Sequence, residues 1–297
     1  MTDASANSPR PLRFVTLNLW GENGPHERRL ALIAAEAARL APDVVALQEV
    51  RQVPGRLPNQ AQTLAQALGA AFTYVFAPST AWGGGDEGLA VVSRFPILEH
   101  AARPLPHATE TEGRIVLSVR VDVPGGDRPA GRGLWVHTTH LSYRVTEGDK
   151  RGDQVQAVHA EVAARAGTTD LPQLVMGDLN TVPDADEIRW LRGLTSLGGA
   201  GRVYYQDAWM VVHGDAPGIT WARENPFRAR MGWLPADRRL DYVLVTAARK
   251  DGRGRVTDAR VAFATPDADG VYPSDHAGVV ADVQVTPDPP NPNEARA

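Results

Sequence analysis

Carboxylate, amide and imidazole side chains stand next to several apolar segments of this 297-residue chain. Groups of these types bind divalent cations, accept protons and hold phosphate oxygens, so they can form a hydrolytic site if the fold brings them together. They come from distant parts of the sequence. The set is Asn18, Glu49, His140, Asp178, Asn180, Asp241, Asp275 and His276.

The oxygen donors in this set indicate a particular kind of metal. Glu49 offers a hard oxygen ligand, and Asp178, Asp275 and the amides of Asn18 and Asn180 can add more. Such donors suit Mg²⁺ or Mn²⁺ better than Zn²⁺. A cation of this kind keeps several waters and is often completed by phosphate oxygens, so a phosphate-ester substrate is expected.

The local spacing of these residues suggests how they divide the work. Asp178 and Asn180 are two residues apart, so in an extended segment both side chains point the same way. Asp275 and His276 are neighbours and point in opposite directions if extended, one toward a metal and one toward a phosphate. A histidine held by a carboxylate is a good general base or phosphate ligand, and Asp241 is the candidate that orients His276.

Each of these residues also has a simpler interpretation. Glu49 can be a turn carboxylate, Asn18 can bend the chain after a strand, and GDLN can be an ordinary turn. A lone histidine such as His140 is most often a core imidazole bonded to the backbone. The case for a site therefore depends on the coincidence of all the residues. Only the structural interpretation is given to His137, His159, His213, Arg151 and Gln154.

The apolar runs beside these residues read as strands. The members of the set from Asn18 to Asn180 each follow such a run, whereas Asp241, Asp275 and His276 precede one. Antiparallel neighbours bring the end of one strand beside the start of the next, so both groups can share one rim of the sheets. The expected strands are 12–19, 43–47, 72–76, 88–92, 115–123, 134–139, 174–176, 242–245, 256–263 and 279–283.

Fewer segments have helical spacing, at about 30–40, 61–68, 152–166 and 184–191. Many strands with fewer helices favour an α/β or α+β fold in which helices cover the outer faces of mixed sheets. No linker interrupts the alternation, so one domain is expected over 11–286. The polar, proline-rich ends, 1–10 and 287–297, are expected to be flexible tails.

The motifs around these residues form an ordered series that resembles the endonuclease/exonuclease/phosphatase superfamily. Each motif is short, but the ordered set, which covers about Arg13 to Asp282, is specific. The series reads TLNLWG with Asn18, LQEV with Glu49, GLAVVSRFPI, TTHLS with His140, GDLN with Asp178 and Asn180, RRLDYVLV with Asp241, and SDH with Asp275 and His276.

The resemblance implies a four-layer α-β-β-α sandwich like that of deoxyribonuclease I, with a divalent-metal site at the sheet edge. It also implies roles for individual residues. Glu49 is the principal metal ligand, with Asn18 and Asp275 nearby. Asp178 positions or deprotonates the attacking water, Asn180 holds a phosphate oxygen, and His140 lies near the phosphate and the leaving oxygen. His276, oriented by Asp241, is a base or stabilises the phosphoryl charge, so two candidates for the base stay open.

The implied reaction is metal-dependent hydrolysis of a phosphoric ester by in-line attack of water, since no activated serine or cysteine nucleophile is evident. His140 resembles the arrangement in deoxyribonuclease I, neutral sphingomyelinases and deadenylases, whereas abasic-site endonucleases place a tyrosine in that region. Trp20 also stands where those endonucleases carry an acid. The segment before Asp241 also lacks the Trp-x-Asp-Arg pattern of inositol polyphosphate 5-phosphatases. A nuclease-like phosphodiesterase is expected first, then a sphingomyelinase-like lipid phosphodiesterase, then a small-molecule phosphatase. The alternative of another class is a non-catalytic phosphate-binding scaffold.

Residues 220–239, TWARENPFRARMGWLPADRR, are the expected specificity element, because arginines mixed with aromatic residues can hold phosphates and stack bases. The same composition also suits a lipid headgroup layer or a packed surface loop. The segment STAWGGGDEG, with Trp82, is a candidate second wall. The substrate-binding residues expected in 220–239 are Trp221, Arg223, Arg228, Arg230 and Trp233.

The overall composition narrows the class of protein further. The net charge is -4, so no general basic field draws the chain to nucleic acid or anionic lipid, and phosphate binding must arise locally. Cysteine is absent, which excludes disulfides and thiolate chemistry. No apolar run is long enough to span a bilayer, and the start MTDASANSPRP lacks a signal-peptide pattern. A cytoplasmic monomer is expected.

Overall fold

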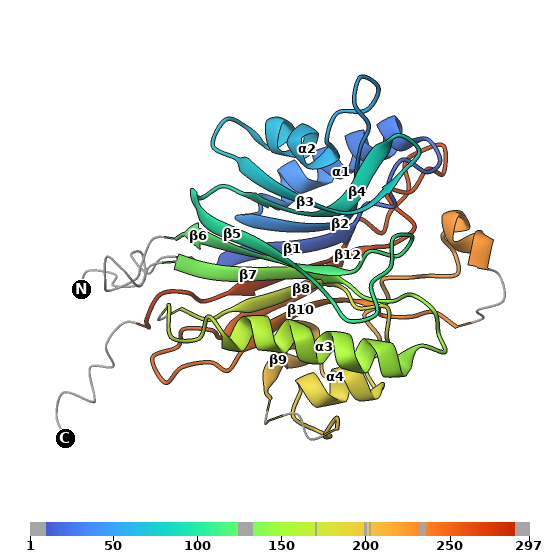
Figure 1. The fold of residues 1–297 in the computed structure, drawn as a ribbon. Helices are drawn as coiled ribbons and strands as arrows, with labels where there is room; N and C mark the ends of the chain where they lie inside the picture. The colour runs from blue at the N-terminus through green and yellow to red at the C-terminus, as the bar shows by residue number, and fades with distance from the viewer. Residues whose placement is uncertain are drawn as a thin grey trace, which may run out of the picture.

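The computed structural model describes residues 10–123, 133–169, 171–198, 201, 203–231 and 236–288. The two expected tails, 1–10 and 287–297, lie outside these ranges except for residues 10, 287 and 288. Within the described residues, two six-stranded mixed sheets pack face to face and helices cover both outer faces (Figure 1). This confirms the expected four-layer sandwich. No helix in these ranges has the length and apolarity needed to cross a bilayer.

The two sheets share one pairing pattern. In each, a central parallel pair, β1 with β2 and β7 with β8, is flanked on both sides by antiparallel strands. The first sheet has the order β11 (Val256–Ala262), β12 (Gly278–Val283), β1 (Leu12–Asn18), β2 (Val44–Gln52), β4 (Gly85–Ser93), β3 (Thr73–Trp82). The second has the order β5 (Ile97–Pro104), β6 (Ile115–Asp122), β7 (Gly133–His140), β8 (Leu174–Asp178), β10 (Asp241–Thr246), β9 (Tyr205–Asp207).

Strand alternation places one set of side chains between the sheets and the other set under the helices. Phe14 and Val44 of the first sheet meet Val136 and Met176 of the second in the buried core between the sheets. The intervening residues, such as Val15, face outward into a separate core beneath the helices. Because both faces are covered, these central strands read as nearly continuous apolar runs.

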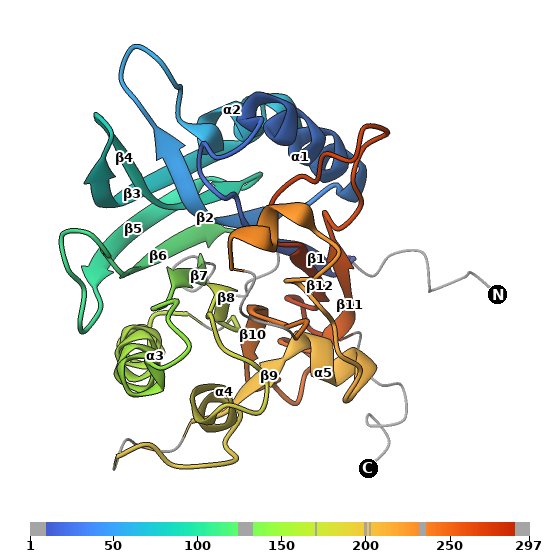
Figure 2. The ribbon, with the colours of Figure 1, turned by 90° about the vertical axis from the view of Figure 1, so that its right-hand side faces the viewer.

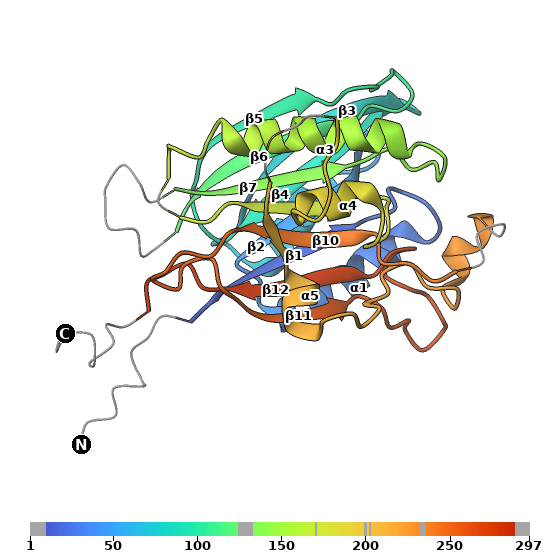
Figure 3. The same cartoon turned by 90° about the horizontal axis from the view of Figure 1, so that it is seen from below.

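The helices close the two outer faces, as Figures 1 and 3 show. On the first sheet, α1 (His26–Leu40) and α2 (Gln60–Leu68) contribute to one core. On the second, α3 (Gly148–Ala163) and α4 (Asp186–Leu191) contribute to another. The short helix α5 (Ala208–His213) packs against β10 and β11, and the 3₁₀ helix η2 (Pro226–Met231) lies at the sheet edge that faces the viewer in Figure 2.

Several elements differ from the sequence-based expectation. β5, β9, α5 and η2 were not expected at all. Among the described residues, β5 pairs with β6 alone at the edge of its sheet and exposes most of its side chains, so it lacks the alternation of a half-buried strand. β2, β3 and β4 are longer than expected. β2 continues to pair with β4 beyond a bulge, up to Gln52 opposite Asp86. The β3–β4 pairing continues through the segment interpreted as a glycine-rich loop, up to Trp82 opposite Gly85.

Candidate active site

Three of the predicted residues form one row across the second sheet. His140 at the end of β7 is the register partner of Asp178 in β8, and Asp178 is the partner of Asp241 in β10. Directly opposite residues in adjacent strands point to the same face, so these side chains project side by side. That face carries the intersheet core further along the same strands. The row is therefore the polar end of the layer between the two sheets.

A buried polar bridge separates this row from the apolar core. The Gln48 amide nitrogen donates to Thr16 Oγ1 at 3.1 Å and to Thr138 Oγ1 at 3.0 Å. All three side chains are fully buried, and the bridge joins β1 and β2 of one sheet to β7 of the other. The two sheets are thereby held together directly behind the site.

Glu49 reaches the site through a β-bulge. The strand was expected to end at Leu47, but β2 continues to Gln52, and Gln48 and Glu49 together oppose the single residue Leu89. Glu49 has a φ of 50°. By alternation alone it would face the helices, and the bulge turns it instead into the cavity between the sheets.

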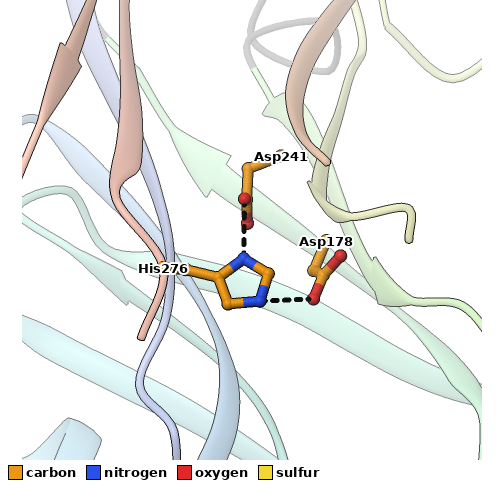
Figure 4. A group of neighbouring side chains, drawn as sticks. All are labelled: Asp178, Asp241 and His276. Atoms are coloured by element: carbon orange, nitrogen blue, oxygen red, sulfur yellow. Dashed lines mark hydrogen bonds and ion pairs between the residues drawn. The ribbon is translucent and has the colours of Figure 1, made fainter. Parts of the chain in front are cut away.

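His276 lies between two aspartates (Figure 4). Its Nδ1 is 2.9 Å from Asp241 Oδ2, and its Nε2 is 3.6 Å from Asp178 Oδ2. Burial acts to lower the pKa of His276, but the charges of Asp241 and Asp178 outweigh it and raise this pKa well above its usual value. Burial likewise raises the pKa of Asp178 to about 7. Although ligand atoms of these three residues cluster within 4.8 Å, a protonated imidazole has no lone pair for a metal, so we interpret them as a proton-handling group.

Asn18 links the two halves of the site. Its Nδ2 donates to Glu49 Oε1 at 3.0 Å and to Asp178 Oδ2 at 3.1 Å. Its Oδ1 already accepts the Trp20 backbone N–H at 2.9 Å. Asn18 therefore sets the separation of two carboxylates that come from different sheets.

The sequence interpretation placed Asn180 in an extended segment, but the structure does not. Its φ is 51°, its backbone N–H donates to Asp178 Oδ1 at 2.9 Å, and its Nδ2 donates to the Leu141 carbonyl at 3.0 Å. The motif GDLN is thus an Asx-type turn, the simpler interpretation, and this turn still places both Asp178 and Asn180 in the lining of one cavity.

The cavity has a volume of about 380 Å³ and opens at the edge of the sheets. Of the predicted catalytic and metal residues, Glu49, His140, Asp178, Asn180, Asp275 and His276 line it. Asn18 and Asp241 lie buried behind this lining and reach it through their hydrogen bonds. Burial, with the charges of Arg114 and His276, lowers the pKa of His140 well below its usual value, so its imidazole is neutral at neutral pH.

The cavity holds oxygen donors that suit a hard cation. Burial and the charge of Glu49 raise the pKa of Asp275 to about 6 and that of Glu87 to about 7. In the described part of the chain, none of these three carboxylates forms an ion pair with an arginine or lysine. In the described residues the ligand atoms of these three carboxylates do not all lie within 4.8 Å of one another. One or two of them with several waters are the ligands that Mg²⁺ usually takes, so the residues present fit such a hydrated cation.

Sequence reasoning missed two charged residues of this cavity, Glu87 and Arg114. Glu87 was assigned to a loop because the strand was expected to start at Gly88. Its alternation with Leu89 and Val91, which face the intersheet core, could have placed it on the site face. Arg114 comes just before β6, and its guanidinium lies 3.3 Å from Glu112.

The expected specificity element, residues 220–239, divides into several roles. Trp221 and Arg228 line the cavity, but both side chains are buried. The Arg228 guanidinium lies 4.0 Å from the centre of the Trp221 ring and donates to the Ala236 carbonyl. Phe227 lines it too and stacks on Trp20 at 4.7 Å. Arg223 is exposed outside the lining. The Arg230 side chain and Trp233 lie outside the described residues.

The residues given a structural interpretation have structural contacts. His137 bonds Ser118 and Gln173 in the core, and His159 bonds the Tyr205 hydroxyl. His213 contacts the Ala259 carbonyl. Arg151 pairs with Glu187 of α4, and Gln154 bonds the backbone of Ser142, so both anchor α3.

Comparison with known proteins matches residues 15–276 to the model of the Endonuclease/Exonuclease/phosphatase family. The chain is 30% identical to "Protein angel" of Drosophila melanogaster over 180 residues, which are 57% of this chain and 49% of that protein. The chain thus spans about half the length of that relative.

Solved structures share the fold. An endonuclease/exonuclease/phosphatase from Beutenbergia cavernae is 27% identical, with a TM-score of 0.68 over 94% of this chain and 72% of that one. D. rerio TDP2, complexed with a single strand DNA product, is 20% identical, with a TM-score of 0.70 over 92% of this chain and 99% of that one. At this lower identity the likeness supports the fold alone.

Proposed function

The chain belongs to the endonuclease/exonuclease/phosphatase family, and we propose that it is a divalent-metal-dependent phosphodiesterase with nuclease-like activity. The observation that carries this proposal is a single cavity lined by Asp178, His276 and the unpaired carboxylates Glu49, Glu87 and Asp275. The first pair can handle protons, and the carboxylates can bind a cation that keeps several waters. A metal-dependent hydrolase of phosphoric esters uses both at one phosphorus atom.

Asp178 accepts the proton of the attacking water in this proposal. A base whose pKa lies near the working pH is the most effective, and burial raises the pKa of Asp178 to about 7. His276 stays protonated between Asp178 and Asp241 and presents a positive charge to the phosphate oxygens. Asp241 fixes the ring through Nδ1. We prefer Asp178 over His276 as the base because a protonated imidazole cannot accept a proton.

Neutral donors complete the hold on the phosphate. His140 can donate from Nε2, which lies 3.4 Å from Asp178 Oδ2. Asn180 uses one amide hydrogen on the Leu141 carbonyl and keeps the other for a phosphate oxygen. The Arg114 guanidinium adds a fixed charge at the cavity wall. Preorganised donors of this kind act on the charge that develops on the phosphoryl oxygens.

We propose Glu49 and Asp275 as the metal ligands, with Glu87 beside them. When bound, the metal supplies Lewis-acid polarisation of the phosphoryl group. Asn18 was predicted as a further ligand, and its hydrogen bonds support a role in spacing Glu49 from Asp178. Hard oxygen donors favour Mg²⁺, with Mn²⁺ as the alternative.

The nuclease-like assignment rests on the walls of the cavity and on relatives. The Phe227–Trp20 stack and the cavity-lining Arg228 and Arg238 are suited to a base and a phosphate. Among fold neighbours, one is described with a single strand DNA product. We further propose a monomer acting in the cytoplasm, which rests on the sequence-based expectation alone.

The test is hydrolysis of three substrate classes with and without a chelator: single-stranded oligonucleotide, sphingomyelin in vesicles and p-nitrophenyl phosphate. We expect metal-dependent cleavage of the oligonucleotide, reduced about 10²- to 10⁴-fold by Asp178→Asn, the range for loss of a general base. Asp153→Asn, on the exposed face of α3, is the matched control and keeps wild-type activity.

The alternatives are separated by the same panel. Cleavage of sphingomyelin alone would replace the nuclease assignment with a lipid phosphodiesterase, and cleavage of the monoester alone would make the protein a phosphatase. Phosphate or oligonucleotide binding without any metal-dependent turnover would leave the non-catalytic scaffold. Equal activity of the Asp178→Asn and wild-type proteins would refute the role of Asp178.

A further inference from the structure

A second cavity of about 140 Å³ adjoins the candidate active site. The two cavities share the side chains of Glu49, Glu87, Arg114, His140 and Tyr143 in their linings. The point where they meet is therefore the group of residues expected around the scissile phosphate. Asp178 and His276 line only the larger cavity, which places the proposed base on that side.

The smaller cavity has polar, well-fixed walls. Ser79 and Thr80 of β3 and Thr111 and Gly113 of the loop between β5 and β6 line it, and this strand and this loop are in direct contact. The Gly113 N–H donates to Thr80 Oγ1 at 3.0 Å. A Cβ on Gly113 would lie 1.8 Å from the Ser79 carbonyl oxygen, so this close approach requires glycine. The β3–β4 hairpin and this loop reach the same edge of the molecule (Figure 2).

In-line displacement assigns the two cavities to opposite sides of the phosphorus atom. The attacking water and the leaving oxygen lie roughly in line across phosphorus. With Asp178 in the larger cavity, the leaving group points toward the smaller one. The water oxygen bonds phosphorus as the bond to the leaving oxygen breaks. Asp178 takes a proton from the water, and the leaving oxygen takes one from solvent.

We infer that the smaller cavity is the leaving-group subsite and that it selects a compact polar alcohol such as a sugar. Its volume of about 140 Å³ suits a sugar ring and not the diacyl-sized apolar body of a lipid. Thr80 Oγ1, which accepts the Gly113 N–H, keeps its hydrogen for such an alcohol, and Ser79 Oγ, which donates to the Glu87 carbonyl at 3.2 Å, keeps a lone pair. The larger cavity then holds the substituent that stays on phosphorus, so the substrate is a diester with one group in each cavity. This inference rests on the proposed function.

The test compares substrates that differ only in the leaving group. Thymidylyl-thymidine is measured against the methyl esters of thymidine 3′- and 5′-phosphate, with release of thymidine monophosphate as the readout. We expect kcat/KM to favour the dinucleoside substrate by about tenfold or more, since a site built to bond hydroxyls discriminates against an analogue that lacks them. Thr111→Trp, which fills the smaller cavity from an exposed loop position, brings this ratio close to one.

Glu110→Trp is the matched control, because Glu110 is exposed in the same loop and does not line the cavity. It keeps the wild-type ratio. Equal kcat/KM for the two kinds of ester in the wild type would overturn the inference, and this result does not depend on whether Thr111→Trp folds. A folded Thr111→Trp protein with an unchanged ratio would overturn it as well. Absence of metal-dependent hydrolysis of every ester would instead overturn the proposed function.

Discussion

At the residue scale, the most unusual group outside the reacting set is the buried guanidinium of Arg29. It is 1% exposed, and its N–H groups donate to the carbonyls of Leu19, Trp20, Gly21, Asn23 and Pro273. Burial lowers the pKa of Arg29 to about 10, against the opposing charges of Asp275 and Glu49. One helix side chain thus ties the loop after β1 to the segment that precedes Asp275.

Replacing Arg29 with methionine should therefore be costly. Arg29→Met leaves several buried carbonyl groups without a donor, and each such group costs about 1–3 kcal/mol, so we expect a loss of at least about 3 kcal/mol of unfolding free energy in urea. Arg29→Lys should lose less, because an ammonium retains three donors. Arg39→Met, exposed on the same helix, is the control. Equal stabilities of the two methionine variants would contradict this account.

His137 provides a pH dependence that is independent of the active site. It is fully buried between Ser118 and Gln173, and burial lowers the pKa of His137 to about 4. Between pH 6.5 and 4 the unfolded chain binds a proton at this residue that the folded chain does not. The free energy of unfolding consequently falls as the pH falls through this window, by up to about 1.4 kcal/mol per pH unit.

His137→Gln removes this contribution. The difference in unfolding free energy between wild type and His137→Gln should shrink as the pH is lowered from 7 to 4, as measured by urea titration at each pH. The same substitution at His100, exposed on β5, is the control. Its free energy of unfolding should fall between pH 7 and 4 as steeply as that of the wild type. A difference that stays constant with pH would show that His137 takes up its proton in the folded state.

Single residues differ in how far the sequence could place them. Asn18, His140, Asp178 and Asp241 end or begin strands whose alternation is regular, so period two puts them on the intersheet face. Glu49 reaches that face only through a bulge, which breaks the alternation, and no composition signal marks the bulge. Its position was recovered from the resemblance of LQEV, not from periodicity.

At the element scale, the close pairing of β7 with β8 depends on Gly177. Its φ is +149°, and a Cβ there would lie 2.0 Å from the Thr139 carbonyl oxygen. Backbone cannot move aside without breaking the parallel ladder that holds His140 beside Asp178. Gly177→Ala should cost about 3 kcal/mol or more in unfolding free energy and abolish activity.

The control separates steric overlap from backbone strain. Gly55 also has a positive φ, +72°, but a Cβ there meets nothing within 4 Å. Gly55→Ala should therefore cost only about 1 kcal/mol, the strain of a left-handed alanine, and keep full activity. Similar losses in the two alanine variants would mean that the overlap at Gly177 is relieved by a backbone shift.

Elements were predictable where packing fixes a clear period. The central strands, buried on both faces, and helices α1 to α4 follow their apolar patterns. β9 has three residues, too few to show alternation. α5 is a six-residue apolar run, AWMVVH, that reads equally as a strand. It is helical because the Asp207 side chain caps it by accepting the backbone N–H groups of Trp209 and Met210.

At the scale of the whole molecule, the site is a product of the repeated sheet pattern. Each sheet contributes the carboxyl ends of its parallel pair, β1 with β2 and β7 with β8, and the start of the antiparallel strand beside it, β12 or β10. The order of motifs indicated the family, but the pairing order of the strands does not follow from alternation. Strand pairing depends on contacts across the chain, which a local pattern does not encode.

The site also links metal binding to the stability of the whole fold. Glu49 of β2 repels Glu87 of β4 and Asp275, which comes just before β12, so residues far apart in the chain meet in one cavity. A cation that binds only the folded protein stabilises it by roughly 2.7 kcal/mol at a hundredfold excess over its Kd. Mg²⁺ or Mn²⁺ should therefore raise the Tm by several degrees, and a chelator should reverse the shift.

Glu49→Gln tests whether this stabilisation arises at the proposed site. The amide removes one of three repelling charges but keeps an oxygen that can accept the Asn18 Nδ2 hydrogen bond, so without metal the variant should be at least as stable as the wild type. Its Tm should no longer respond to Mg²⁺, because the remaining carboxylates hold less charge. Asp186→Asn, an exposed acid at the start of α4, keeps the full response. A metal-dependent rise in Tm that survives Glu49→Gln would place the cation elsewhere in the molecule.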